Sequence, residues 1–454
     1  MKKQVLSLFM AFVLSFSMLP MSAFARGETG STEISMNGGE TVTGGDAGKN
    51  AAGGVYQEND SAPGGGIYDP GDATGGVSVM SVEGGEHTNH CICGGSETVN
   101  GHTHDTTIPE WTEWTKTDSL PSSEGSYYLT QPVTSDWTVP SGDFKLCLNG
   151  QTFFGRITIS TGATLTLTDC TGEGKLQGDN QKTGVTINGG TFNLYGGTIT
   201  GFVNGVQIGQ KSSPAAGSTF TMYGGTITGN VGSSGGGGVF LVGTTTQNID
   251  PTFIMHGGTI SNNTADASDG GGGGVYVGEK CSFTMDGGTI TGNETTSGNG
   301  GGIYIDNLAV KAEISNATIT DNKATATGNT SRGLGGGIYS QKSLTVSGST
   351  ITNNEATYHG GGICGAGSIT LVDTKVTNNR STASNGGGVY ASKMSATSFT
   401  NQPLSVSGST KISGNAPNNY YANEERQLPM ARRRLLISRQ TALLRMAMSR
   451  LSRR

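Results

Sequence analysis

TFTMYGGTITGN, residues 219–230, contains two short stretches in which apolar and hydroxyl-bearing residues alternate. Phe220 and Met222 alternate with threonines, and Ile227 lies between two further threonines. A period of two is typical of a β-strand with one apolar face, and glycine or asparagine suits the sharp corner that ends such a strand. The segment therefore predicts two short strands joined by a tight turn.

The same phrase recurs along the chain. Close copies begin at Thr191, Thr252 and Ser282, and looser copies begin at Ala312, Ser343, Ser368 and Leu404. A second phrase stands between the copies: GGGGVFLV ends at Val242, GGGGVYV ends at Val277, and GGGIYI, GGGIYS, GGGIC and GGGVYA follow. The anchoring residues Ile199, Ile227, Ile260, Ile290, Ile319, Ile351, Val376 and Ile412 are 25 to 36 residues apart. A period of this size predicts a solenoid.

Each repeat supplies three short strands with one apolar face, so a single coil cannot bury that face and the coils must stack. Stacking would form two inward columns, one of Phe192, Phe220, Phe253, Phe283, Leu344 and Ile369, the other of Leu194, Met222, Met255, Met285, Ile314, Val346 and Leu371. Glycine and β-branched residues in every copy disfavour helices. Crossovers between parallel strands are right-handed. We predict an all-β fold, a right-handed parallel β-helix of about ten coils over residues 118–423.

One corner of the repeat carries a column of asparagines: Asn230, Asn263, Asn293, Asn322, Asn354, Asn379 and Asn415. Asparagine tolerates the left-handed conformation, and stacked amides can hydrogen-bond along the stack. We interpret the column as a structural asparagine ladder whose members adopt the left-handed conformation. Turn chemistry accounts for these residues without a binding role.

The N-terminus reads as an export signal. Lys2 and Lys3 precede an apolar run from Val5 to Met21, and Ala23-Phe24-Ala25 suits signal-peptidase cleavage after Ala25. We expect residues 1–25 to be a signal peptide, no membrane span after its removal, and an extracellular or cell-surface location. Residues 26–86 are rich in Gly, Ser, Thr and acidic residues without a hydrophobic period, and we interpret them as a disordered linker.

Charge is divided unevenly. Residues 424–454 hold nine Arg against two Glu, so they carry +7 and the remainder carries −13 of the net −6. An acidic body gives no reason to expect nucleic-acid binding. The basic tail contains no Gly and matches nothing before it, and we interpret it as out-of-frame or truncated coding sequence. The alternative is a basic amphipathic helix that binds anionic surfaces.

The GGGIY…GGTITGN repeat resembles the large β-helical surface proteins of Gram-positive anaerobes, and more distantly the polymorphic outer-membrane-protein repeats. The resemblance covers residues 118–416 and includes an entry coil that runs from SLPSSEGSYYLT (119–130) through LCLNGQTF (146–153) to GATLTLTDC (162–170). It implies the fold strongly and the function weakly, because one fold hosts many functions. Nothing in the chain resembles the membrane barrel that ends the polymorphic outer-membrane proteins.

Residues 87–117 form a His/Cys/Trp segment. Imidazole and thiolate groups are good zinc ligands, and closely spaced ones can be presented by one loop. We expect a zinc knuckle formed from His87, His90, Cys91, Cys93, His102 and His104. The alternatives are a disulfide from Cys91 or a metal-free histidine-rich loop. We expect Trp111, Trp114 and the later Trp137 to close the N-terminal end of the helix, because a solenoid needs a cap.

For function, the sequence favours a non-catalytic extracellular scaffold or adhesin-like protein. The acids of the coils are single and dispersed, whereas a glycosidase needs two facing carboxylates. A polysaccharide lyase or glycosidase on this fold is the alternative. The GGGIY phrase places one residue outward beside each inward Val or Ile, and we expect Phe240, Tyr276, Tyr304, Tyr339 and Tyr390, with Cys364 among them, to form an exposed aromatic strip. Such a strip suits a glycan or a partner protein, unless the rings only stabilise neighbouring coils.

Overall fold

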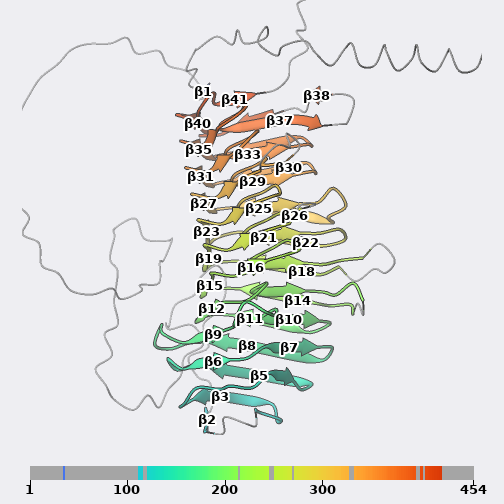
Figure 1. Ribbon diagram of the computed structural model, residues 1–454, viewed down its shortest axis with the longest axis vertical. Coiled ribbons are helices and arrows are strands. Elements are labelled where there is room, and N and C mark those ends of the chain that lie inside the picture. Colours follow the sequence, from blue (N-terminus) through green and yellow to red (C-terminus); the bar gives the residue numbers. More distant parts are fainter. Residues whose placement is uncertain are drawn as a thin grey trace, which may run out of the picture. The chain divides into compact units, whose positions relative to one another are not determined.

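The computed structural model describes residues 111–421, except 116–119, 213–214, 245–249, 268–269, 327–331, 395–398 and 402–403, together with the two-residue strand β1 (Ile34–Ser35). Within these residues the fold is all-β, and the chain winds as a right-handed parallel β-helix whose coils stack along one axis (Figure 1). The expected fold is thereby confirmed. No helix among the described residues has the length and apolar character needed to span a membrane.

Each coil begins in sheet 1, which contains the Thr-Phe-Thr-Met strands and their equivalents. Its strands, in stacking order, are β2 (Thr112–Trp114), β3 (Gly125–Leu129), β5 (Gly142–Cys147), β8 (Ala163–Thr168), β11 (Thr191–Leu194), β14 (Thr219–Met222), β18 (Thr252–Met255), β22 (Ser282–Met285), β26 (Lys311–Ser315), β30 (Leu344–Ser347), β34 (Ile369–Val372) and β39 (Leu404–Ser407).

Sheet 2 contains the Thr-Ile-Thr strands, which follow the first corner of each coil. They are β6 (Thr152–Phe154), β9 (Lys175–Gln177), β12 (Thr198–Thr200), β15 (Thr226–Thr228), β19 (Thr259–Ser261), β23 (Thr289–Thr291), β27 (Thr318–Thr320), β31 (Thr350–Thr352), β35 (Lys375–Thr377) and β40 (Lys411–Ser413). These ten strands stack in parallel and match the predicted number of about ten coils. Strand β1 pairs antiparallel with β40 at the end of the sheet.

Sheet 3 is absent from the sequence prediction, which gave each coil three strands. It consists of six two-residue strands, β16 (Val231–Gly232), β20 (Thr264–Ala265), β24 (Glu294–Thr295), β28 (Lys323–Ala324), β32 (Glu355–Ala356) and β36 (Arg380–Ser381). The second residue of each strand is small and buried. Two residues are too few to show a period, so pattern analysis could not detect this sheet.

Sheet 4 contains the strands that follow the glycine runs. They are β4 (Trp137–Val139), β7 (Ile157–Ser160), β10 (Val185–Asn188), β13 (Val206–Ile208), β17 (Val239–Leu241), β21 (Val275–Val277), β25 (Ile303–Ile305), β29 (Ile338–Ser340), β33 (Ile363–Gly365) and β37 (Val389–Met394). At its C-terminal end β37 also pairs in parallel with β41 (Tyr420–Tyr421) and antiparallel with β38 (Phe399–Asn401).

The predicted inward columns form one continuous core. Phe220, Phe253 and Phe283 are fully buried, and their rings stack at centroid distances of 4.8 and 5.3 Å. Met222, Met255 and Met285 form the adjacent buried column, in register from strand to strand. At the N-terminal end, Trp114 and Trp137 lie in the end strands β2 and β4 and pack against this core, in agreement with a capping role.

The second glycine of the Gly-Gly corner, three residues after each core methionine, is required by two features of the coil. Gly288 has a φ of +85°, and a Cβ atom built on it would lie 2.6 Å from the terminal methyl of Met255 in the preceding coil. Only glycine combines a left-handed backbone with such a close approach. The Gly-Gly corner thus lets the methionine column fill the core without a gap.

The asparagine ladder is confirmed. From Asn230 to Asn379, the side-chain amide of each ladder residue donates to the Oδ1 of the next at 2.9–3.0 Å, and the backbone N–H donates to the same oxygen at 2.8–3.1 Å. The expectation that these asparagines are left-handed is wrong. The preceding residue has the positive φ, as Asn262 (52°), Gly292 (63°) and Asp321 (57°) show. The turn that aims each ladder amide inward is therefore made one residue earlier.

Candidate binding surfaces

The predicted aromatic strip exists as a stacked column on sheet 4. Phe240, Tyr276, Tyr304 and Tyr339 are register partners in successive strands, with ring centroids 4.9–5.4 Å apart. After Cys364, Tyr390 continues the column and stacks on Tyr421 at 5.2 Å. The sequence therefore identified the correct neighbours.

The predicted exposure of this strip is wrong for most of its members. Tyr304, Tyr339, Cys364 and Tyr390 retain 7% or less of their accessible surface, and only Phe240 and Tyr276 are half-buried. Burial raises the pKa of the Tyr276 and Tyr339 phenols to about 12. Tyr304, Tyr339 and Tyr390 belong to a second apolar cluster outside the main core, and Tyr276 packs against it.

Described residues of the segments between sheets 3 and 4 pack against these rings. Leu334 and the half-buried Tyr358 come from such segments and pack into the same cluster. Gly270 belongs to the segment that passes over Tyr276. A Cβ atom on this glycine would lie 2.8 Å from the ring, so no larger residue fits there without a shift. These segments vary in length from repeat to repeat, so the repeat pattern gave no sign that they fold back.

His359 lies in one of these covering segments and stacks on Tyr390, with ring centroids 4.1 Å apart. Its Nδ1 atom is buried and has no hydrogen-bond partner among the residues that the structure describes. Burial lowers the pKa of His359 to about 4, and a hydrogen bond with the Asn385 backbone opposes that shift only in part. The imidazole is therefore neutral at pH 7.

This lowered pKa predicts acid sensitivity. The unfolded chain takes up the His359 proton near pH 6.5 and the folded chain only near pH 4, so stability is complete above pH 6.5 and falls as the pH drops from 6.5 toward 4. The loss should reach about 3 kcal/mol. We expect His359→Phe, which keeps a ring on Tyr390, to reduce this loss in denaturant titrations at pH 7 and pH 4.5. An equal pH dependence in the variant would contradict the assignment.

A second aromatic column lies on the outer face of sheet 1, at the position just before the Gly-Gly corner. Tyr195 stacks on Tyr223 at 4.4 Å, and Tyr223 stacks on His256 at 5.2 Å. The Nδ1 atom of His256 lies 2.7 Å from a carboxylate oxygen of Asp286 in the following coil. All four side chains are half-buried. We call these residues the sheet 1 column.

The sheet 1 column was not singled out in the sequence, although a signal was present. Tyr195, Tyr223, His256 and Asp286 occupy one position of the four best-matched copies. An alternation count assigns that position to a turn, because it follows the last inward residue of the strand. Only the stacking of coils shows that the four side chains form one row on the surface.

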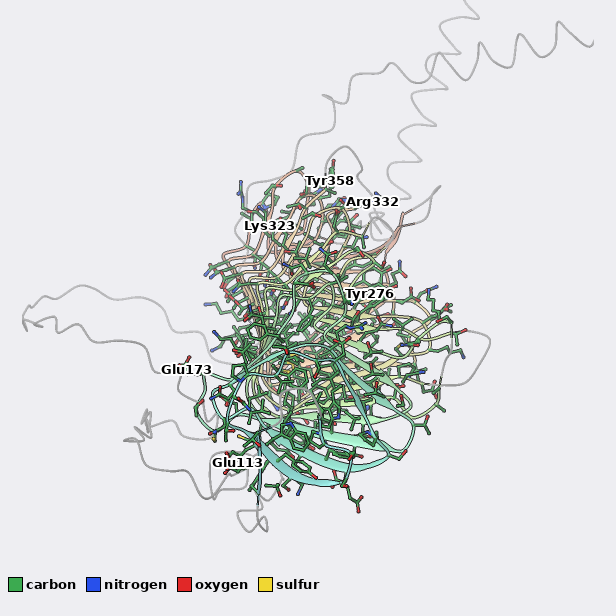
Figure 2. The ribbon with its side chains drawn as sticks, turned by 60° about the horizontal axis from the view of Figure 1, so that its bottom comes forward. Glu113, Glu173, Tyr276, Lys323, Arg332 and Tyr358 are labelled. Carbon is green, nitrogen blue, oxygen red and sulfur yellow. The ribbon has the colours of Figure 1, made fainter. Side chains whose placement is uncertain are left out.

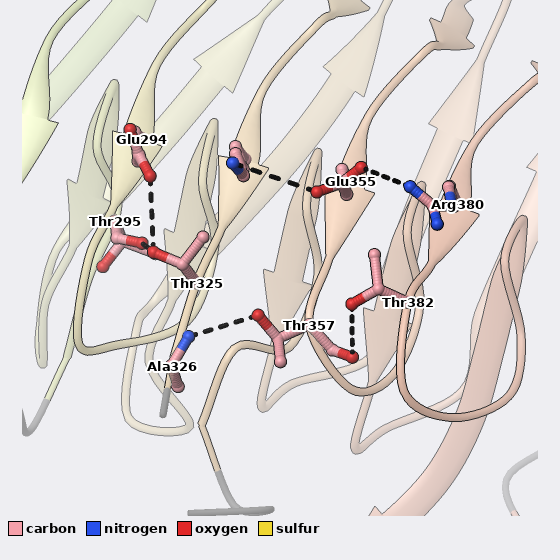
Figure 3. A network of polar contacts seen from close by, with 9 residues as sticks. Glu294, Thr295, Thr325, Ala326, Glu355, Thr357, Arg380 and Thr382 are labelled. Carbon is pink, nitrogen blue, oxygen red and sulfur yellow. Dashed lines mark hydrogen bonds and ion pairs between the residues drawn. The ribbon is translucent and has the colours of Figure 1, made fainter. Parts of the chain in front are cut away.

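Charged side chains form a polar row on the outer face of sheet 3 (Figure 3). Glu355 lies 3.9 Å from the Lys323 ammonium on one side and 3.3 Å from the Arg380 guanidinium on the other. The hydroxyl of Thr325 donates to Glu294 at 3.3 Å. Such partly exposed pairs contribute little stability, typically below about 1 kcal/mol each. The row therefore makes this face of sheet 3 polar but adds little to the stability of the helix.

Acidic residues elsewhere are dispersed over the outside of the helix, as Glu113 and Glu173 illustrate at the N-terminal coils (Figure 2). Among the described residues, no group of three or more His, Cys, Asp or Glu side chains is placed to hold a metal ion. The predicted zinc ligands His87, His90, Cys91, Cys93, His102 and His104 lie outside the described residues, as do the basic tail and, apart from Ile34–Ser35, the linker.

Comparison of the chain with protein-family models, with curated proteins and with solved structures finds no match in any of the three.

Proposed function

We propose that the chain is a non-catalytic extracellular scaffold, adhesin-like in character, that binds a glycan or a partner protein along the face of its β-helix. The resemblance of its repeats to β-helical surface proteins of Gram-positive anaerobes supports this proposal, as does the export signal predicted at residues 1–25. The zinc knuckle predicted at residues 87–104 would be a separate structural module ahead of the helix.

The observation that carries the proposal is the sheet 1 column. Tyr223 stacks on a ring on either side, and Tyr195 and His256 each stack on Tyr223, so little conformational entropy is lost when a ligand binds. Phenol, imidazole and carboxylate groups follow one another along the row, and together they can donate to and accept from hydroxyl groups. Tyrosine also presents apolar ring carbon beside its hydroxyl, which suits the mixed surface of a sugar.

The test compares the two aromatic columns. We expect Tyr195→Ser combined with Tyr223→Ser to weaken binding to a glycan array or to host cell surfaces at least about tenfold, which corresponds to about 1.4 kcal/mol, with little change in the melting curve. Because the rings of sheet 4 are mostly buried, Tyr276→Ser combined with Tyr304→Ser is the matched control and should lower the melting temperature.

Two outcomes would contradict the proposal. Binding that survives the Tyr195 and Tyr223 replacements unchanged would remove the sheet 1 column as the contact surface. Release of shorter fragments from a polysaccharide by the purified wild-type chain would show the alternative, a lyase or glycosidase activity.

A further inference from the structure

Two cysteine thiols contact each other near the N-terminal end of the described helix. Cys147 is the last residue of β5, and its register partner in the next coil is Thr168, the last residue of β8. Cys170 follows two residues later, and its thiol interacts with that of Cys147. The Cys170 thiol also lies 3.5 Å from Oδ1 of Asn149, which follows Cys147 by two residues, so the two cysteines stand in the same corner of successive coils.

The corners that hold the two cysteines are tied to each other. The Asp169 carboxylate accepts hydrogen bonds from the backbone N–H groups of Gly150 and Gly174, both at 2.8 Å. The Cys170 thiol lies 3.5 Å from Oδ1 of Asn149, and the amide of Asn149 donates to the Leu129 carbonyl at 2.9 Å. The bonds of Gly150 and Cys170 join the coils of β5 and β8, the Asn149–Leu129 bond joins the coils of β3 and β5, and the Gly174 bond holds the corner within one coil. The thiols are therefore held together by the fold before any bond joins them.

This part of the helix lacks the device that ties later coils together. The asparagine ladder begins at Asn230, and the coils of β5 and β8 precede it. Terminal coils of a solenoid have a neighbour on fewer sides and open most readily. A covalent link between these two coils would strengthen a part of the helix that lies before the ladder and close to its N-terminal end.

We propose that Cys147 and Cys170 form a disulfide bond once the chain reaches an oxidising environment, and that this bond clamps two N-terminal coils together. Cys170 is the more exposed of the two thiols, so it meets an external disulfide first. Its thiolate attacks that disulfide to form a mixed disulfide, and Cys147 then displaces the external thiol. The two cysteines lose two protons and two electrons, and the external disulfide is reduced to two thiols.

Differential alkylation of the full chain tests the bond directly. The protein is incubated with oxidised glutathione, denatured and alkylated without reduction, then reduced and alkylated with a second reagent of different mass. We expect peptide mass spectrometry to find the second label on Cys147 and Cys170. The buried Cys281 and Cys364 lie in other coils, and they should carry the first label. The first label on both Cys147 and Cys170 would overturn the proposal.

Variants test the clamp. We expect a reducing agent to lower the melting temperature of the oxidised wild type by several degrees and to speed amide hydrogen exchange in β5 and β8. Cys170→Ala, at the more exposed position, and Cys147→Ala should each abolish that response. Cys281→Ala is the matched control, a buried thiol in another coil, and should retain it. A melting temperature and exchange rate that reduction leaves unchanged in the wild type would contradict the clamp.

Discussion

Replacing Met255 with aspartate is expected to unfold the coils around β18. Met255 has no accessible surface, and it lies between Met222 and Met285 in the inner column. The replacement removes a large apolar side chain and buries a carboxylate that has no partner there. The combined cost should exceed about 4 kcal/mol of the free energy of unfolding. Coils of a solenoid depend on their neighbours, so the loss should spread to β14 and β22.

The neighbouring residue provides a charge-matched control. Ile254 lies on the same strand but points outward and is half-buried, so Ile254→Asp should cost about 1 kcal/mol. Urea titration followed by circular dichroism, together with proteolytic cleavage sites, would compare the two variants. A Met255→Asp protein with the wild-type midpoint would show that the methionine column is not the core.

Replacing Asn293 with alanine is expected to have the second-largest effect. Its amide donates to the Ile260 carbonyl at 2.9 Å and to Oδ1 of Asn322 at 3.0 Å, while its own oxygen accepts from the Asn263 side chain and backbone. Alanine would leave several of these buried groups without a partner. Each unsatisfied group costs about 1–3 kcal/mol, and members of a network affect one another, so we expect a loss of about 3–5 kcal/mol.

Asn262 is the matched control for the ladder. It is exposed and has a φ of 52°, so Asn262→Gly keeps a residue that accepts the left-handed conformation. Its effect on the free energy of unfolding should stay within about 1 kcal/mol. Equal losses in Asn262→Gly and Asn293→Ala, measured by urea titration, would indicate that the turn rather than the ladder stabilises this corner.

Much of the fold could be predicted because every repeat has the same alternation of apolar and polar residues. Phe220, Phe253 and Phe283 align without any structure, and burial of one face of each strand leaves few ways to arrange them. The asparagine column was also visible, since identical residues at one position of a repeat must stack. Its backbone conformation was not visible, because glycine, asparagine and aspartate all accept a positive φ and the turn residue stands one position earlier.

The sequence by itself determined the solenoid, its inward columns and the order of its aromatic neighbours. Which outer face meets solvent was decided only by the tertiary structure, because the segments between sheets 3 and 4 fold back over Tyr304 and Tyr339 and leave Tyr195 and Tyr223 half-exposed. The contact between Cys147 and Cys170 could not be predicted either, because it depends on how the corners of two successive coils lie against each other. The physical reason is that a period of two reports which side of a strand faces inward, whereas coverage of the other side depends on non-periodic segments.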